Sequence, residues 1–339
     1  MRRNGGAVAG AVPAPATVGE AAARRRARRR WVWRRRGVVI LLMSPWIVGF
    51  SVFLCYPLVM NIYLSFTRYN LLAPPEWVGL ANYRYLLTED TMVFPAVLNT
   101  LWFIAVSVPT RIVFAFGAAV MLARAKHGVG VLRTIFYLPA LAPPVAATLA
   151  FVFLMNPSTG PVNFILGKLG ITGPLWFNSP AWSKPSLVLL AVWGVGNIMI
   201  IFLAAVLDVP RQLYEAAEID GAGPVQRLRY VTIPSVSPVI LFAVVIGVIE
   251  GLQYFTQAFV ASSVAAGQAS QQGSIANLEL GYPLGSTLFY PILLYFNGFR
   301  YFQMGYAAAM ATLLLVVALA FTALIIRSAR HWVHTGARP

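Results

Sequence analysis

The stretch from Val38 to Phe66 reads VVILLMSPWIVGFSVFLCYPLVMNIYLSF, and no charged side chain occurs between Arg36 and Arg68. A helix rises about 1.5 Å per residue and satisfies its own backbone hydrogen bonds, so roughly 17–25 apolar residues can cross the hydrocarbon of a bilayer. The stretch exceeds this minimum. It therefore predicts a first membrane-spanning helix and makes lipid part of this chain's solvent.

Further apolar stretches follow along the 339 residues. The composition is 59% hydrophobic and 11% charged, more apolar surface than a water-soluble core could hide. The later spans are expected at about Val97 to Ala123, Thr134 to Met155, Pro185 to Leu207, Val236 to Val260 and Gly305 to Ile326. The prediction is an all-α integral membrane protein with six transmembrane helices.

Basic residues are distributed unevenly between the predicted loops. The chain has 26 Lys and Arg against 10 Asp and Glu, a net charge of +16. Most of the basic residues fall in 1–37, in the segments after the second and fourth spans, and after the sixth span. Because Lys and Arg accumulate in short cytoplasmic segments, both termini are predicted to be cytoplasmic. The charge follows membrane topology, so nucleic acid is not expected as a partner.

The N-terminal tail, residues 1–37, contains three Arg triplets, Arg24–Arg26, Arg28–Arg30 and Arg34–Arg36. We expect a mostly disordered cytoplasmic tail whose arginines anchor the first span at anionic lipid headgroups. A dedicated patch for acidic lipid or nucleic acid is the alternative interpretation. A second cytoplasmic tail is predicted at 328–339.

Few side chains could support catalysis or bind a metal. Cys55 is the single cysteine and the three histidines are scattered, so neither a disulfide framework nor a metal site is predicted. A nucleotide-binding loop needs Gly-Lys-Ser/Thr after an upstream glycine, and only Gly167-Lys168-Leu169 approaches this pattern. We expect no catalytic residue and no ATP hydrolysis by this chain.

The segment 208–234, between the fourth and fifth spans, is patterned throughout. Asp208 and Pro210 favour a helix start, Gly221 favours its left-handed end, and Pro224 can open a second short helix. Small alanines and a concentration of carboxylates on this otherwise basic side indicate a surface for a partner of complementary charge. An ordinary amphipathic loop is the alternative.

The same segment resembles the EAA loop of ABC-importer permeases. The resemblance rests on Glu215-Ala216-Ala217, on Gly221 after three residues, and on Val231-Thr232-Ile233-Pro234 after nine more. Further similar pieces are Tyr56-Pro57, Val78 to Tyr83, Arg133 to Pro139 and Phe302 to Ala309. Together they resemble the MalF-type, carbohydrate-transporting branch of the type I importers.

That resemblance implies a type I ABC importer permease (MetI-like) core at 38–327, in a bacterial inner membrane, with an outer gate segment at 261–304. It implies as partners a second homologous permease of the MalG type, a homodimeric ATP-binding subunit that holds ATP and Mg, and an extracytoplasmic solute-binding protein. This chain itself would carry no cofactor. The coupling residues carried over are Glu215, Ala216, Ala217, Asp220, Gly221 and Pro234.

Polar side chains inside the predicted spans point to a solute pathway. In an unbroken fifth helix, Glu250, Gln253, Tyr254 and Gln257 would share one stripe, which lipid would penalise. Planar polar groups bind sugar hydroxyls and aromatic rings cover sugar faces, a chemistry typical of concave ligand sites. The pathway candidates are Trp193, Asn197, Glu250, Gln253, Tyr254, Gln257 and Arg111. Alternatively, these groups join helices to one another, and for Arg111 and Glu250 a structural ion pair or a partner contact is favoured.

Prolines at Pro109, Pro139, Pro143 and Pro144 are expected to bend their spans. The predicted function is that of a permease subunit, which forms half of the translocation pathway for a di- or oligosaccharide. Membrane lipid surrounds the subunit. A stand-alone secondary transporter or channel for a small polar solute is the competing hypothesis. The particular solute does not follow from these residues.

Overall fold

Six apolar segments account for most of the described chain. A computed structural model describes residues 38–125, 127–271 and 280–333; the predicted tail 1–37 and residues 334–339 lie outside them. Four described helices are long and apolar enough to cross a membrane: Val38–Ser65, Val93–Arg124, Pro224–Leu252 and Met304–Ala329. Two bent helix pairs raise the number to six if each pair is one span. Each of these six segments overlaps one of the six predicted spans.

The chain divides into two compact units, Met1–Met60 and Asn61–Pro339. The helix that starts at Val38 contains a π-helical turn, η1 (Ser51–Cys55), and continues as α2 (Tyr56–Ser65) into the second unit. A short antiparallel hairpin, β1 (Thr67–Arg68) and β2 (Glu76–Trp77), leads to α3 (Ala81–Thr88). Asn82 Nδ2 donates to the backbone oxygens of Ser65 and Thr67, both at 2.9 Å, and so fixes α3 to the end of α2.

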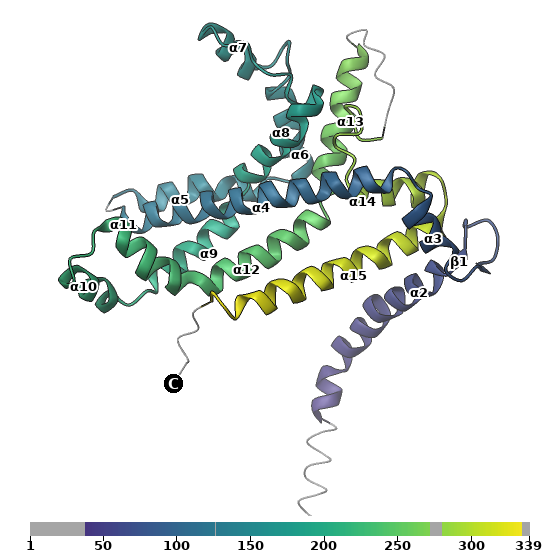
Figure 1. Ribbon diagram of the computed structural model, residues 1–339, viewed down its shortest axis with the longest axis horizontal. Helices are drawn as coiled ribbons and strands as arrows, with labels where there is room; N and C mark the ends of the chain where they lie inside the picture. Colours follow the sequence, from purple (N-terminus) through teal and green to yellow (C-terminus); the bar gives the residue numbers. More distant parts are fainter. Residues whose placement is uncertain (1–37, 126, 272–279, 334–339) are drawn as a thin grey trace, which may run out of the picture. The chain divides into compact units, whose positions relative to one another are not determined.

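The helix α4 (Val93–Arg124) is central to the second unit (Figure 1). It packs against α8 (Pro180–Trp193), α9 (Gly196–Leu207) and α12 (Ile233–Leu252), while α15 (Met304–Ala329) packs on α12. The helix α4 continues through Pro109 as one α-helix. Neighbouring helices evidently hold the span together despite the missing backbone donor.

Two spans are bent at short breaks. The third consists of α5 (Val129–Tyr137), η2 (Leu138–Leu141) and α6 (Pro144–Leu154), with a bend of 98°. Its break contains the predicted prolines. After α7 (Pro161–Lys168) and η3 (Trp176–Asn178), the fourth span is α8 followed by α9, with a bend of 49° at Gly194 and Val195. This second break depends on glycines rather than proline.

The fifth span corrects the prediction of an unbroken helix from Val236 to Val260. The helix α12 ends at Leu252, and α13 (Thr256–Gln271) is a separate helix. Tyr254 N donates to Gly251 O, three residues back, so the i to i−4 ladder ends here. The break follows Gly251, a residue type that weakens helices. The predicted outer gate segment, 261–304, therefore begins within α13.

The predicted coupling segment forms α10 (Arg211–Ile219), α11 (Pro224–Arg227) and the π-helical turn η4 (Leu228–Thr232), which runs directly into α12. At the other end of the chain, α14 (Tyr290–Tyr295) and η5 (Phe296–Arg300) precede α15. The loop helix α10 lies toward the end of the bundle where α4 and α15 end, at the left of Figure 1. Which end faces the cytoplasm stays a prediction from the charge distribution.

Glycines allow α12 to approach α4 closely. A Cβ atom on Gly247 would lie 3.1 Å from Val108 Cγ1, and one on Gly251 would lie 2.5 Å from Ile104 Cγ1. This Gly-x-x-x-Gly spacing is the small-residue pattern that lets membrane helices pack backbone to side chain. The contact sets the distance between the two helices that carry Arg111 and Glu250.

We predict that Gly251→Val destabilises the purified protein by about 1–3 kcal/mol, because the added methyl groups overlap Ile104 in a packed contact. The measurement is thermal unfolding in detergent. Gly117→Val is the matched control, since nothing lies within 4 Å of a Cβ at this glycine of α4. Equal unfolding temperatures for the two variants would contradict the packing argument.

Candidate functional site

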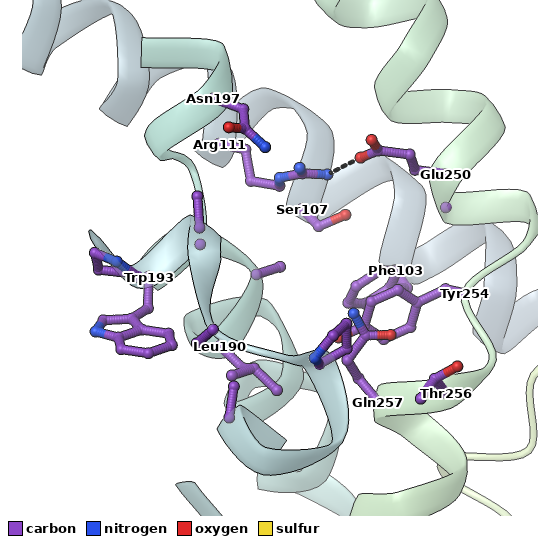
Figure 2. Close-up of a pocket in the computed structure, with 18 of the residues that line it drawn as sticks. Phe103, Ser107, Arg111, Leu190, Trp193, Asn197, Glu250, Tyr254, Thr256 and Gln257 are labelled. Atoms are coloured by element: carbon purple, nitrogen blue, oxygen red, sulfur yellow. Dashed lines mark hydrogen bonds and ion pairs between the residues drawn. The ribbon is translucent and has the colours of Figure 1, made fainter. Parts of the chain in front are cut away.

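A cavity of about 460 Å³ lies within the second unit (Figure 2). Its lining comes from α4, the segment 139–147, α8, α9, and the break between α12 and α13. All of the predicted pathway residues line it: Arg111, Trp193, Asn197, Glu250, Gln253, Tyr254 and Gln257. The structure thus brings together seven side chains from three separate spans, although the fifth span does not form the predicted single stripe.

One wall of the cavity carries an ion pair. Arg111 Nη1, on α4, lies 2.9 Å from Glu250 Oε2, on α12. The Arg111 side chain is 17% exposed and that of Glu250 is 51% exposed, so the guanidinium is the more deeply placed partner. Arg111 Nε is buried and has no hydrogen-bond partner among the described residues. The pair joins two helices and still leaves part of the guanidinium free.

Aromatic rings form two further sides of the cavity. Tyr254 stacks on Phe103 with ring centroids 4.2 Å apart, and its buried hydroxyl has no partner in the described chain. Trp193 lies across the cavity from these rings in Figure 2. Its ring packs against that of Phe151, with ring centroids 5.2 Å apart. The sequence analysis did not select Phe103, although its i, i+4, i+8 spacing with Ser107 and Arg111 indicates the same helix face.

The cavity amides are not used to join helices. Within the described residues, the side chains of Asn197, Gln253 and Gln257 make no hydrogen bond, and Asn197 and Gln253 are exposed. Thr100, in contrast, donates to Ala96 O and accepts from Tyr290 N, so it serves packing away from the cavity. Free amides facing a cavity are available to a ligand.

The coupling segment has the predicted geometry of helix, glycine bend and helix. Gly221 has φ of +79°, and α11 begins at Pro224. Within the described part of the chain, no residue of α10 is buried. Its apolar side chains Leu213 and Ile219 are 47% and 87% exposed. Two contacts hold α10 in place: Tyr214 and Thr232 share a hydrogen bond of 3.0 Å, and Arg227 Nη1 lies 3.2 Å from Glu218 Oε2.

Five of the six coupling residues of the sequence analysis belong to this hairpin. Glu215, Ala216 and Ala217 lie in α10, Asp220 caps it, and Gly221 forms the bend. Pro234 is at the start of α12. Glu215 also forms an exposed i, i+4 pair with Arg211 at 3.2 Å. The structure describes their positions, and their role stays a proposal.

Broken apolar helices around a polar cavity, together with an exposed helical hairpin, define a solute-transporting membrane protein. The model of one family, described as "Binding-protein-dependent transport system inner membrane component", matches residues 111–331. The chain belongs to this family and is a multi-pass permease of the inner membrane. This family is a component of binding-protein-dependent transport systems, so the family assignment disfavours the competing hypothesis of a stand-alone carrier or channel.

Similar proteins cover nearly the whole chain. The probable ABC transporter permease protein YesP of Bacillus subtilis (strain 168) is 35% identical over 293 residues, 86% of this chain and 90% of YesP. The lactose transport system permease protein LacF of Rhizobium radiobacter is 32% identical over 289 residues, 83% of this chain and 91% of LacF.

The fold has also been seen in a solved structure, that of a bacterial alginate ABC transporter in complex with alginate pentasaccharide-bound periplasmic protein. A chain of that structure aligns with a TM-score of 0.71 and 22% identity, over 89% of this chain and 97% of that chain. At this level of identity the likeness concerns the fold alone.

For the cavity ion pair, we predict a coupling free energy of about 0.5–3 kcal/mol in a double-mutant cycle of Arg111→Met and Glu250→Gln. Each single change leaves one charged side chain without its oppositely charged partner, whereas the double change removes both charges. Thermal unfolding of the purified protein measures the coupling.

The matched control is the pair Arg84–Glu89, at 3.9 Å and with side chains 80% and 56% exposed. Its coupling should stay within about 1 kcal/mol, as for other solvent-exposed pairs. Additive effects of Arg111→Met and Glu250→Gln would show that the cavity pair does not join the helices.

Proposed function

We propose that this permease forms half of the translocation pathway of an ATP-driven importer for a di- or oligosaccharide. The observation that carries the proposal is the cavity, in which unpaired amides and an ion pair face aromatic rings. Sugars present hydroxyls to planar polar groups and apolar ring faces to aromatic side chains. Relatives support this class, since LacF belongs to a lactose transport system and AraP of Bacillus subtilis to an arabinooligosaccharides transport system.

The free side chains favour ligand binding over helix joining. Polar residues that join membrane helices make hydrogen bonds between helices. Among the described residues, Arg111 and Glu250 do so, whereas Asn197, Gln253 and Gln257 do not. We therefore assign sugar hydroxyls to the three amides, and a joining role to the ion pair.

We predict that Asn197→Ala and Gln253→Ala raise the sugar concentration for half-maximal stimulation of ATPase activity by about 5–10-fold each, as expected for one hydrogen bond to a ligand. Assembly and basal ATPase activity should stay unchanged. The measurement is ATPase activity in vesicles, titrated with sugar-loaded binding protein.

Thr100→Val is the matched control, because Thr100 lies on α4 but does not line the cavity, and its hydroxyl is already bonded to the backbone of Ala96 and Tyr290. This variant should not change the apparent affinity for the sugar. Loss of assembly without a change of affinity in the amide variants would assign them to helix joining and overturn the sugar-site proposal.

The second part of the proposal concerns energy coupling. Exposed apolar side chains on a short helix in water indicate a protein-binding surface, and α10 presents Leu213 and Ile219 beside the carboxylates of Glu215 and Glu218. We assign this surface to a separate homodimeric ATP-binding subunit, which holds ATP and Mg. A second, homologous permease completes the pathway, and a solute-binding protein delivers the sugar.

A continuous path leads from that surface to the cavity. Movement of α10 acts on Thr232 through Tyr214, at 3.0 Å, and Thr232 is itself buried. Thr232 belongs to η4, which continues into α12 without a break. The far end of α12 carries Glu250, so this arrangement supports transmission of a force from the hairpin to the ion pair.

We predict that Gly221→Pro abolishes sugar uptake while the protein still inserts in the membrane. Proline fixes φ near −65°, but Gly221 has φ of +79°, so the hairpin cannot keep its bend. The measurement is ATP-driven uptake into vesicles that contain the complete complex, with the basal ATPase rate recorded in parallel.

Gly223→Ala is the control, since Gly223 has φ of −70° and an added Cβ meets only Gln226 Oε1 at 3.8 Å. Its uptake should equal that of the wild type. Normal uptake by Gly221→Pro would contradict the coupling role of the hairpin but would leave the sugar cavity untouched.

A further inference from the structure

A second cavity, open to the outside, lies on another face of α4. It has a volume of about 800 Å³ and is bounded by α4, by Lys184 of α8, and by the segment 284–286. The side chains of its α4 wall are mainly apolar and include Phe94, Leu98, Leu101 and Trp102. These four are at least 36% exposed. We refer to this cavity as the Lys184 groove.

One cation is held at a fixed place in the Lys184 groove. Lys184 Nζ donates to Asn99 Oδ1 at 2.8 Å and lies 5.2 Å from the centre of the Trp102 ring. Asn99 is oriented in turn, because its Nδ2 donates to Gly285 O at 2.9 Å and to Leu288 O at 3.0 Å. This hydrogen-bond chain positions the ammonium at the wall of an apolar groove.

The positive charge of Lys184 is not neutralised within the described residues. No carboxylate there lies within ion-pair distance, and Asn99 and Trp102 are both uncharged. An ammonium has three donors, of which Asn99 uses one. A charge within a membrane span is costly unless it meets an anion or water. The site is therefore suited to an anionic group with apolar chains attached.

The Lys184 groove faces away from the proposed sugar pathway. At about 100° per residue, its α4 residues are centred roughly 170° around the helix from the cavity residues Phe103, Ser107 and Arg111. A pathway shared by two permeases lies between them, so the opposite face of α4 is directed to lipid. This step rests on the proposed function.

We propose that the Lys184 groove binds one anionic phospholipid. Lys184 receives the headgroup phosphate, and Trp102 flanks the headgroup at the membrane interface, where tryptophan is enriched. The acyl chains follow Leu101 and Ala105, toward the middle of α4. Basic pockets between membrane helices bind anionic headgroups in this way. A zwitterionic phospholipid carries an additional cation beside its phosphate and binds less tightly.

The experiment compares lipid retention by the purified complex after exchange into phosphatidylglycerol or phosphatidylcholine. Native mass spectrometry counts the lipids that survive delipidation. Wild-type protein should keep about one phosphatidylglycerol more than phosphatidylcholine per chain. Lys184→Gln should weaken phosphatidylglycerol binding about fivefold, the effect of one basic residue near a membrane surface. Lys184→Arg should retain the lipid, and it also tests whether loss of charge or loss of folding causes the effect.

Two control variants isolate the groove. Lys168 lies 4.6 Å from the Phe164 ring but outside the groove, so Lys168→Gln should not change retention. Glu279 lies outside the described residues, and Glu279→Gln should also leave retention unchanged; increased lipid binding by this variant would show that the charge of Lys184 is neutralised in the protein and would overturn the proposal.

Equal retention of phosphatidylglycerol by wild type and Lys184→Gln would overturn the lipid proposal. Loss of the second permease from Lys184→Gln, with lipid unchanged, would overturn it as well and identify the groove as a protein interface. Sugar-stimulated ATPase activity is measured in parallel. A defect in Asn197→Ala without one in Lys184→Gln separates the sugar cavity from the lipid groove.

Discussion

The close approach of α4 and α12 is the contact on which the rest of the second unit depends. Gly247 and Gly251 provide the space for Val108 and Ile104, and this packing brings Arg111 within 2.9 Å of Glu250. The hydrophobic effect does not drive helices together in lipid, so small residues and polar contacts must provide the attraction. Here the glycines determine the distance, and the ion pair is the polar contact that this distance permits.

The breaks in three spans share one location. Ala142, Gly194 and the segment 253–255 interrupt the third, fourth and fifth spans, and all of them line the polar cavity. Non-helical backbone at membrane depth is tolerated only where protein buries it or where it lines a water-filled cavity. The breaks and the cavity therefore require each other: the unpaired backbone needs a polar space, and the bent helices create it.

The sequence predicted the features that depend on length, charge or turn chemistry. Six charge-poor stretches, the prolines near Pro143, and Gly221 each have a local cause that is visible in the residues, and each is found in the structure. The break after Leu252 was missed because its cause is tertiary: Gly251 serves the contact with Ile104, and no proline marks the interruption. The predicted fourth span begins at Pro185 and so leaves out Lys184, yet Lys184 lies within α8, where Asn99 fixes it.

The uninterrupted rod formed by α11, η4 and α12 has a mechanical consequence. Pro224–Leu252 contains 29 residues, which corresponds to a length of about 43 Å. Tilting such a rod by about 5° around one end moves the other end by about 4 Å. That travel exceeds the 2.9 Å between Arg111 and Glu250. A small angular change at the hairpin end of this helix therefore corresponds to a displacement of several ångströms at the end that carries Glu250.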